Sequence, residues 1–226
     1  MNKKSSALFL FFIIELYSVN TFGQLIGEFG LKSGFTSAWQ TEIISGDKLK
    51  GIDNKSGLVF GFYAEIFKSQ WYSINTELNY SQKGMQTEIP FTNEQYPDGT
   101  GEFIKSNLRL NYLSVLILPR IYKNIQSLKF YAFAGPRFDI EISKNNNVSG
   151  PEPSRTLFSD GVEKQLNNYK SFQFGLSLGL GLQVKELLPF CFGIEARYNP
   201  DLSKVYDAEN SYIKNNSIDL LLTIAI

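Results

Sequence analysis

Residues 171–184 constrain the fold of this chain more than any other stretch, because large apolar side chains occupy every second position. Side chains alternate between the two faces of a β-strand, so one face is apolar and the other carries only glycine, serine and glutamine. A strand of about 14 residues tilted by about 40° rises roughly 35 Å, enough to cross a bilayer, whereas ordinary strands average about 5–6 residues. The stretch therefore predicts one transmembrane β-strand whose lipid-facing residues are Phe172, Phe174, Leu176, Leu178, Leu180, Leu182 and Val184.

The same alternation recurs in seven further segments, and the connections between the segments alternate in length. Short periplasmic turns and longer extracellular loops are typical of outer-membrane barrels. The predicted fold is an all-β, eight-stranded, antiparallel up-and-down transmembrane β-barrel with short periplasmic turns and four longer extracellular loops. The other strands are predicted at residues 25–37, 57–67, 71–86, 105–122, 128–142, 188–199 and 217–226, and the long loops at 39–56, 87–103, 143–169 and 200–214.

Two features of the central strands depart from simple alternation. In segment 105–122, Leu108 and Leu110 share one parity, whereas the apolar residues from Leu113 onward share the other. A bulge near Asn111 would switch the faces and reconcile the two sets. Prolines at positions 119 and 136 lack an N–H donor, so each is predicted to mark a bulge or a strand end.

The N-terminus has the pattern of a secretory signal peptide. Lys3 and Lys4 precede the apolar run 7–14, and small residues lie just before position 24. The sequence therefore predicts a cleaved signal peptide at residues 1–23 and one β-barrel domain at residues 24–226. The alternative is an N-terminal helix that belongs to the core.

Charged residues are predicted to face the barrel interior on nearly every strand. Buried charges persist only when they are paired and hydrogen-bonded, so a mutually neutralising network is expected. A proton or substrate path is one interpretation, but an eight-stranded interior is narrow enough for side chains to fill, which favours a structural plug. The predicted network contains Glu28, Lys32, Glu65, Glu77, Arg137, Asp139, Glu195 and Arg197, and further inward charges are Lys83, Arg120, Glu141 and Asp219.

Aromatic residues gather where the predicted strands meet their connections. Rings at these heights are typical of the girdles at the two membrane interfaces, although ordinary cross-strand aromatic pairs are the alternative. The predicted girdle residues are Trp71, Tyr72, Tyr122 and Phe130 beside short turns, and Trp39, Tyr80, Phe172 and Tyr198 beside long loops.

The composition argues against catalysis and against nucleic-acid binding. The chain has no histidine and a single cysteine, Cys191, which is a more plausible inward filler than a nucleophile because no histidine is available to activate it. The net charge is zero, which provides no electrostatic attraction for nucleic acid. No phosphate-binding or hydrolase motif occurs. We predict no catalytic residue, no cofactor and no metal site.

Several short motifs together resemble the PorT-like outer-membrane β-barrel family over residues 24–226. The resemblance implies an eight-stranded barrel in the outer membrane of a Gram-negative bacterium, inserted by the barrel assembly machinery, without catalytic residues. Such barrels commonly end in an aromatic residue that assembly recognises, whereas this sequence ends in Ile226. The motifs are G-L-K-S-G-F at 30–35, N-T-E-L-N-Y-S-Q-K-G at 75–84, L-N-Y-L-S-V-L-I-L-P-R at 110–120, Y-A-F-A-G-P at 131–136 and E-A-R-Y at 195–198.

The predicted function is a structural or interaction role in the outer membrane, with lipid around the wall and any extracellular partner at the loops. The longest loop, 143–169, carries Leu157 and Phe158 as candidate contacts, with packing against a neighbouring loop as the alternative. The second hypothesis is a secreted soluble eight-stranded barrel that binds an apolar ligand. A membrane hydrolase is disfavoured by the absence of histidine, and a passive pore by the narrow barrel.

Overall fold

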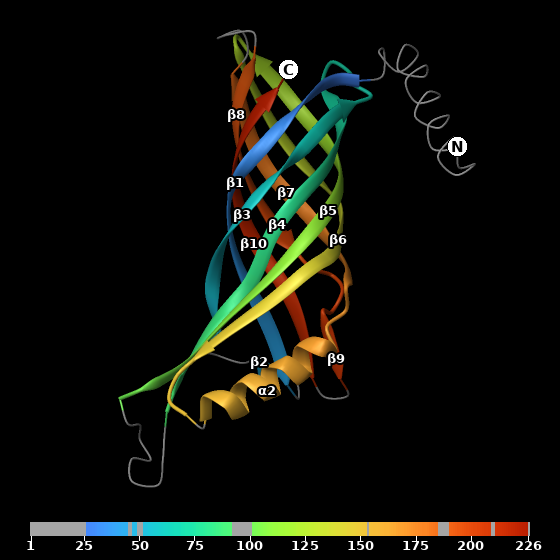
Figure 1. The fold of residues 1–226 in the computed structure, drawn as a ribbon. Coiled ribbons are helices and arrows are strands. Elements are labelled where there is room, and N and C mark those ends of the chain that lie inside the picture. The colour runs from blue at the N-terminus through green and yellow to red at the C-terminus, as the bar shows by residue number, and fades with distance from the viewer. Residues whose placement is uncertain are drawn as a thin grey trace, which may run out of the picture.

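Eight long antiparallel strands close into a barrel in the computed structural model, which describes residues 26–44, 47–48, 52–91, 101–152, 154–184, 190–208 and 211–225 (Figure 1). The last strand pairs with the first, from Gly30↔Ala225 to Ile44↔Ser211, so the ring has no open seam. This confirms the predicted fold class. The wall strands are β1 (Ile26–Ile44), β3 (Ile52–Ile66), β4 (Tyr72–Pro90), β5 (Phe103–Ile125), β6 (Leu128–Ser149), β7 (Phe172–Val184), β8 (Cys191–Pro200) and β10 (Ser211–Ala225).

The side chains of the wall alternate as the sequence predicts. On β7, Leu178 is 42% exposed on the outer surface, whereas its neighbour Ser177 is completely buried inside. The same assignment holds on β1, where Phe35 is 69% exposed and Lys32 is buried. The barrel therefore has an apolar outside and a polar inside.

Strand β5 does not switch faces, so the predicted bulge in this strand is wrong. Its even-numbered residues are buried all the way from Ile104 to Tyr122. The register does shift at the predicted height, from Asn111↔Ser143 to Tyr112↔Glu141, but the extra residue lies in β6. Leu108 and Leu110 face inward because the outside of β5 becomes polar beyond Leu113 while the inside becomes apolar.

The two prolines lie inside continuous strands, so the prediction that each marks a bulge or a strand end is wrong as stated. Pairing of β5 with β6 stops after Leu116↔Arg137 and resumes at Arg120↔Phe133, and Pro119 and Pro136 both fall within this gap. The ladder is interrupted where two residues lack an N–H donor. Gly135 lies in the same gap, where an added Cβ would come 2.0 Å from the carbonyl oxygen of Ile117.

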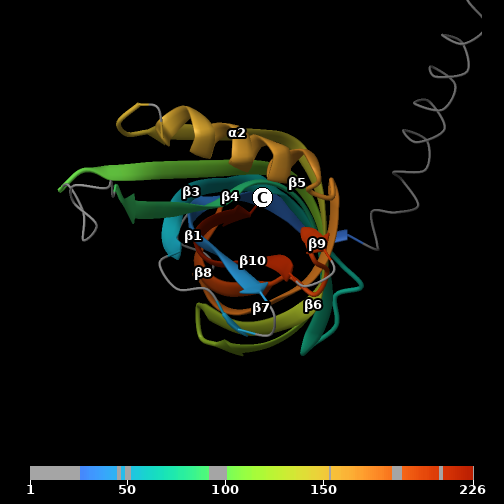
Figure 2. The same ribbon diagram turned by 90° about the horizontal axis from the view of Figure 1, so that it is seen from below.

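The predicted long loops contain regular structure that the sequence did not predict. Strands β4, β5 and β6 extend beyond the ring, and the predicted loop 143–169 holds the end of β6 and helix α2 (Ser154–Asn167). Helix α2 lies across the end of the barrel where the long connections are (Figures 1 and 2). The short strands β2 (Asp47–Lys48) and β9 (Tyr206–Ala208) lie at the same end.

Tyr122 is 8% exposed and its hydroxyl donates to the carbonyl of Ser69, so its assignment to an outer girdle is wrong. In the part of the chain that the structure describes, no helix is long and apolar enough to cross a membrane. The predicted signal peptide 1–23, the predicted turn 185–187 and Ile226 lie outside the described residues.

Candidate functional site: the charged interior and the covered mouth

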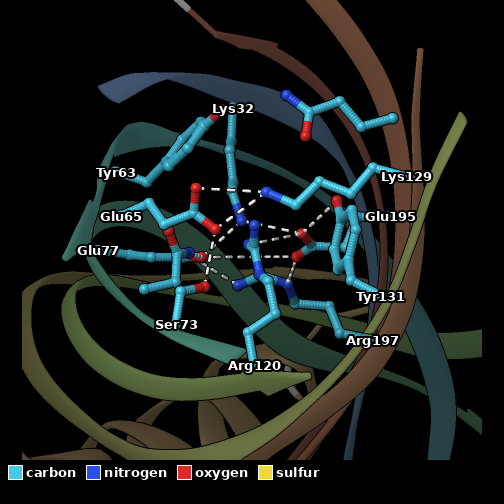
Figure 3. A network of polar contacts seen from close by, with 12 residues as sticks. Lys32, Tyr63, Glu65, Ser73, Glu77, Arg120, Lys129, Tyr131, Glu195 and Arg197 are labelled. Carbon is cyan, nitrogen blue, oxygen red and sulfur yellow. Dashed lines mark hydrogen bonds and ion pairs between the residues drawn. The ribbon is translucent and has the colours of Figure 1, made fainter. Parts of the chain in front are cut away.

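Glu77 on β4 lies at the centre of a buried ion cluster inside the barrel (Figure 3). Lys32 Nζ is 2.5 Å from Glu77 Oε1 and 2.9 Å from Glu195 Oε2. Arg197 Nη1 is 2.9 Å from the other Glu77 oxygen, and its guanidinium also bonds Glu195. Inward positions of β1, β4 and β8 meet here, so residues far apart in the sequence neutralise one another.

Two amides complete the coordination of the Glu77 carboxylate. Asn75 Nδ2 donates to one oxygen at 2.5 Å, and Asn79 Nδ2 donates to the other at 2.9 Å. Both asparagines lie two positions from Glu77 along the same strand, which places them on the same inward face. Each oxygen of this carboxylate thus accepts bonds from a cation and an amide, as a buried charge requires.

Glu65 and Glu28 extend the cluster toward the short turns. Lys129 Nζ lies 2.9 Å from Glu65 Oε1, and Ser73 Oγ donates to the same oxygen at 2.7 Å. Tyr63 donates to Glu28 at 2.9 Å. We call this group the turn-side cluster. Its inward members are four cations and four carboxylates, namely Lys32, Arg120, Lys129 and Arg197 with Glu28, Glu65, Glu77 and Glu195. At the short turn the partly exposed Lys68 also pairs with Glu65, at 3.2 Å.

Arg120 and Tyr131 link the cluster to β5 and β6. The Arg120 guanidinium carbon lies 4.2 Å from the centre of the Tyr131 ring, a cation–π contact. The Tyr131 hydroxyl donates to Glu195 at 3.1 Å. Gly181 on β7 pairs with Tyr131, and a Cβ at Gly181 would come 2.1 Å from the tyrosine ring. Glycine at this position lets the ring lie flat against the wall.

A second cluster, the mouth-side cluster, lies nearer the long connections. Lys83 Nζ is 2.5 Å from Asp139, and Arg137 Nε is 2.9 Å from the same Asp139 oxygen. Arg137 also pairs with Asp201, which lies just past the end of β8. Among the described residues, one carboxylate oxygen of Asp139 and one of Asp201 have no hydrogen-bond partner.

A cavity of about 20 Å³ separates the two clusters. Its lining includes Lys83 and Arg137 from the mouth-side cluster and Arg197 from the turn-side cluster. A cavity of this volume holds about one water molecule. At this height, therefore, the described residues leave little free space inside the barrel.

The structure places all eight residues of the predicted network inside the barrel, but in two groups rather than one. Arg137 and Asp139 belong to the mouth-side cluster. The residues of the turn-side cluster among the eight are Glu28, Lys32, Glu65, Glu77, Glu195 and Arg197.

Sequence reasoning missed two members of these clusters. Lys129 has the same parity as Arg137 on β6 and is completely buried, so the alternation contained the signal for it. Asp201 falls in the predicted loop 200–214, and it points inward because of an isolated bridge to Gly175. No local pattern in the sequence indicates that bridge.

The mouth of the barrel is closed by apolar side chains instead of charges. Leu166 at the end of α2 and Tyr169 just after it are 6% exposed and pack against inward residues of β5 and β10. The Tyr169 hydroxyl donates to Gln40 on β1 at 3.3 Å, and burial raises the pKa of Tyr169. The residues of this mouth cluster are Leu108, Leu110, Tyr112, Leu166, Tyr169, Val205 and Ile213.

The two predicted loop contacts lie on the first half of α2, away from the residues that close the mouth. Leu157 is 71% exposed, and Phe158 is half-buried. Neither belongs to the mouth cluster. No group of three or more His, Cys, Asp or Glu side chains among the described residues is arranged to hold a metal ion.

A closed eight-stranded barrel with an apolar exterior, a charged interior and all long connections at one end defines the class of outer-membrane β-barrels. The chain belongs to the outer membrane protein beta-barrel domain family, whose model matches residues 23–207. The match is to this broad family, and the narrower PorT-like resemblance stays a prediction.

Solved outer-membrane proteins are similar to this chain in fold. Ail of Yersinia pestis, solved with a heparin analogue, is 15% identical, with 88% of this chain and 98% of Ail covered and a TM-score of 0.40. OprG of Pseudomonas aeruginosa is 13% identical, with 89% of this chain and 95% of OprG covered and a TM-score of 0.41. The protease OmpT of Escherichia coli is 9% identical, with 88% of this chain and 95% of OmpT covered and a TM-score of 0.43. No curated protein sequence matches the chain. At these identities, nothing about the neighbours' activities transfers to it.

Proposed function

We propose that this chain is a non-enzymatic integral outer-membrane β-barrel protein of a Gram-negative bacterium. In this proposal residues 1–23 are a cleaved signal peptide, and the barrel assembly machinery inserts the remainder. The proposal rests on the position of apolar side chains outside the wall and charged side chains inside it. Leu180 is 67% and Leu222 is 65% exposed outside, whereas Arg197 is 3% exposed inside, the reverse of a water-soluble barrel.

The interior of the barrel acts as a structural plug in this proposal. The inward members of the turn-side cluster balance one another's charges, and the space between the two clusters is about 20 Å³. A substrate or ion path needs mobile, hydrated charges, whereas these charges are held by one another and by buried amides. The packing thus favours the plug over a transport path.

The interaction surface is the rim, formed by α2 and the extended ends of β4, β5 and β6. Leu166 and Tyr169 anchor α2 to the mouth, while Leu157, in the first turn of the helix, is left exposed. We propose Leu157 and Phe158 as contacts for an extracellular partner. An exposed leucine on a helix that Leu166 anchors to the mouth supports this assignment.

Cell fractionation and heat-modifiability on a denaturing gel test the membrane setting. We expect the mature protein to fractionate with the outer membrane and to migrate differently before and after boiling. A protein that stays monomeric in buffer without detergent, with a single mobility, refutes the proposal. That result would support the second candidate, a secreted soluble barrel that binds an apolar ligand.

Thiol labelling on intact cells tests whether the rim faces outward. Leu157→Cys should react with a membrane-impermeant maleimide on intact cells, because position 157 is exposed on α2. Ser69→Cys, in the short turn between β3 and β4, should react only after the outer membrane is permeabilised. The wild-type protein, whose single cysteine Cys191 is half-buried, sets the background. Equal labelling of the two variants on intact cells contradicts the orientation.

A further inference from the structure

An apolar groove of about 510 Å³ lies on the outer surface of the barrel near the short turns. Its volume falls within the range of about 300–1,000 Å³ that is typical of small-molecule sites. The groove runs from Trp71, just before β4, across β5 and β6 to the second half of β7. The side chains that shape it are Trp71, Ile121, Lys123, Phe130, Ala132 and Leu180.

Ala132 on β6 creates the hollow. It pairs with Ile121 on β5 and with Leu180 on β7, whose side chains are 59% and 67% exposed. A methyl group between two large projecting side chains leaves a depression in the wall. Phe130 and Trp71, which are 42% and 62% exposed, form further sides of this depression.

Lys123 stands at the edge of the groove. Every outward residue of β5 from Leu113 to Ile121 is apolar, and Lys123 is the next outward position and is exposed. It has no acidic partner among the described residues. Trp71 and Tyr72 form a ring pair at the same end of the wall, with centroids 4.9 Å apart, as is typical of a membrane interface.

We propose that this groove binds one anionic glycerophospholipid, with an acyl chain along Ala132 and the phosphate on the Lys123 ammonium. The apolar walls match a hydrocarbon chain, and an unpaired cation at the height where the apolar belt ends matches a phosphate. The inference takes the membrane setting of the proposed function as given. It adds a specific lipid site to the lipid-facing wall.

Native mass spectrometry of the refolded full chain in detergent, titrated with dioleoyl-phosphatidylglycerol, tests the proposal. We expect one tightly retained lipid per barrel. Ala132→Phe fills the hollow and should weaken retention by at least tenfold. Lys123→Gln removes one charge near the phosphate and should weaken it by about fivefold. Dioleoylglycerol, which lacks the phosphate, should bind wild type and Lys123→Gln equally.

Matched controls separate the groove from general lipid adhesion. Ala196→Phe changes an outward alanine on β8 that lies outside the groove, and Lys164→Gln removes an exposed charge on α2. Both controls should retain the lipid as wild type does. Equal retention by all variants, or equal loss in Ala132→Phe and Ala196→Phe, overturns the site. Retention of inorganic phosphate alone, unaffected by Ala132→Phe, overturns the acyl-chain part.

Trp71 provides a second readout that does not depend on detergent. In a Trp39→Phe background, Trp71 is the remaining tryptophan, and brominated phosphatidylglycerol in vesicles should quench it more than brominated phosphatidylcholine does. Lys123→Gln should abolish this preference. If Ala132→Phe does not fold, the Lys123→Gln comparison decides alone. A heat-modifiable barrel without lipid preference refutes the site only, whereas a soluble protein refutes the membrane setting.

Discussion

Neutralising Glu77 should destabilise the barrel more than any surface charge change. Glu77 holds Lys32 at 2.5 Å and Arg197 at 2.9 Å, and the side chains of both cations are buried. In Glu77→Gln the inward members of the turn-side cluster change from four carboxylates against four cations to three against four. Removing one partner of a buried pair costs about 3–5 kcal/mol, so the unfolding equilibrium should shift by a factor of about 10²–10⁴.

Urea titration of protein folded into lipid vesicles measures this loss, with the heat-modifiable fraction on gels as the signal. Glu88→Gln is the matched control, because Glu88 forms a pair of similar length, 2.8 Å, with Lys105. The side chains of that pair are 49% and 55% exposed, so its loss should cost at most about 1 kcal/mol. Burial is then the main difference between the two experiments.

Equal destabilisation by Glu77→Gln and Glu88→Gln would refute this reasoning. It would mean that water reaches the turn-side cluster and screens its charges, so the interior is not a dry plug. The double variant Glu77→Gln, Lys32→Met removes one charge of each sign. If charge imbalance is the cause, the double variant should recover part of the stability that the single variant loses.

Three further predictions follow from the wall and the mouth. Leu178→Arg places a charge in lipid and should destabilise the barrel by about 2–4 kcal/mol, whereas the effect of Ser177→Arg depends on crowding inside the barrel. Equal folding yields of the two variants in vesicles would contradict the assignment of Leu178 to the outside and Ser177 to the inside. Leu166→Ala should cost about 2–5 kcal/mol in urea titration, and the exposed Leu157→Ala under about 0.5 kcal/mol. Gly135→Val should lower the heat-modifiable fraction, because a Cβ there would lie 2.0 Å from a β5 carbonyl oxygen.

Period-two alternation predicted the wall well because one rule, apolar outside and polar inside, applies along most of each strand. The same rule failed on β5, where it led to a predicted bulge. Leu108 and Leu110 face inward like Leu116 and Leu118 farther along the strand. What changes beyond Leu113 is the environment, because the outside becomes polar and the inside becomes the apolar mouth. Alternation alone cannot distinguish a strand whose surroundings change polarity from a strand whose side chains switch faces at a bulge.

The covering helix could not be predicted for a related reason. Residues 154–167 bury only Leu166 among their fourteen residues, so the helix carries no apolar stripe of the usual width. Its position depends on Lys144, whose Nζ bonds the carbonyl of Leu166 at 2.9 Å, and on the mouth residues from distant strands. Those contacts are long-range, whereas the signals of a strand are local.

At the rim, β5 and α2 extend beyond the part of the wall that closes the barrel. On β5 the outward residues are polar from Asn111 to Lys105, so the strand projects beyond the apolar belt by roughly 20 Å at about 3.3 Å per residue. The inward Leu108 and Leu110 on this projection need a cover, and the end of α2 supplies it through Leu166. Since Leu166 anchors the helix while Leu157 faces solvent, Leu157→Asp should leave folding intact and weaken partner binding, whereas Leu166→Asp should impair both.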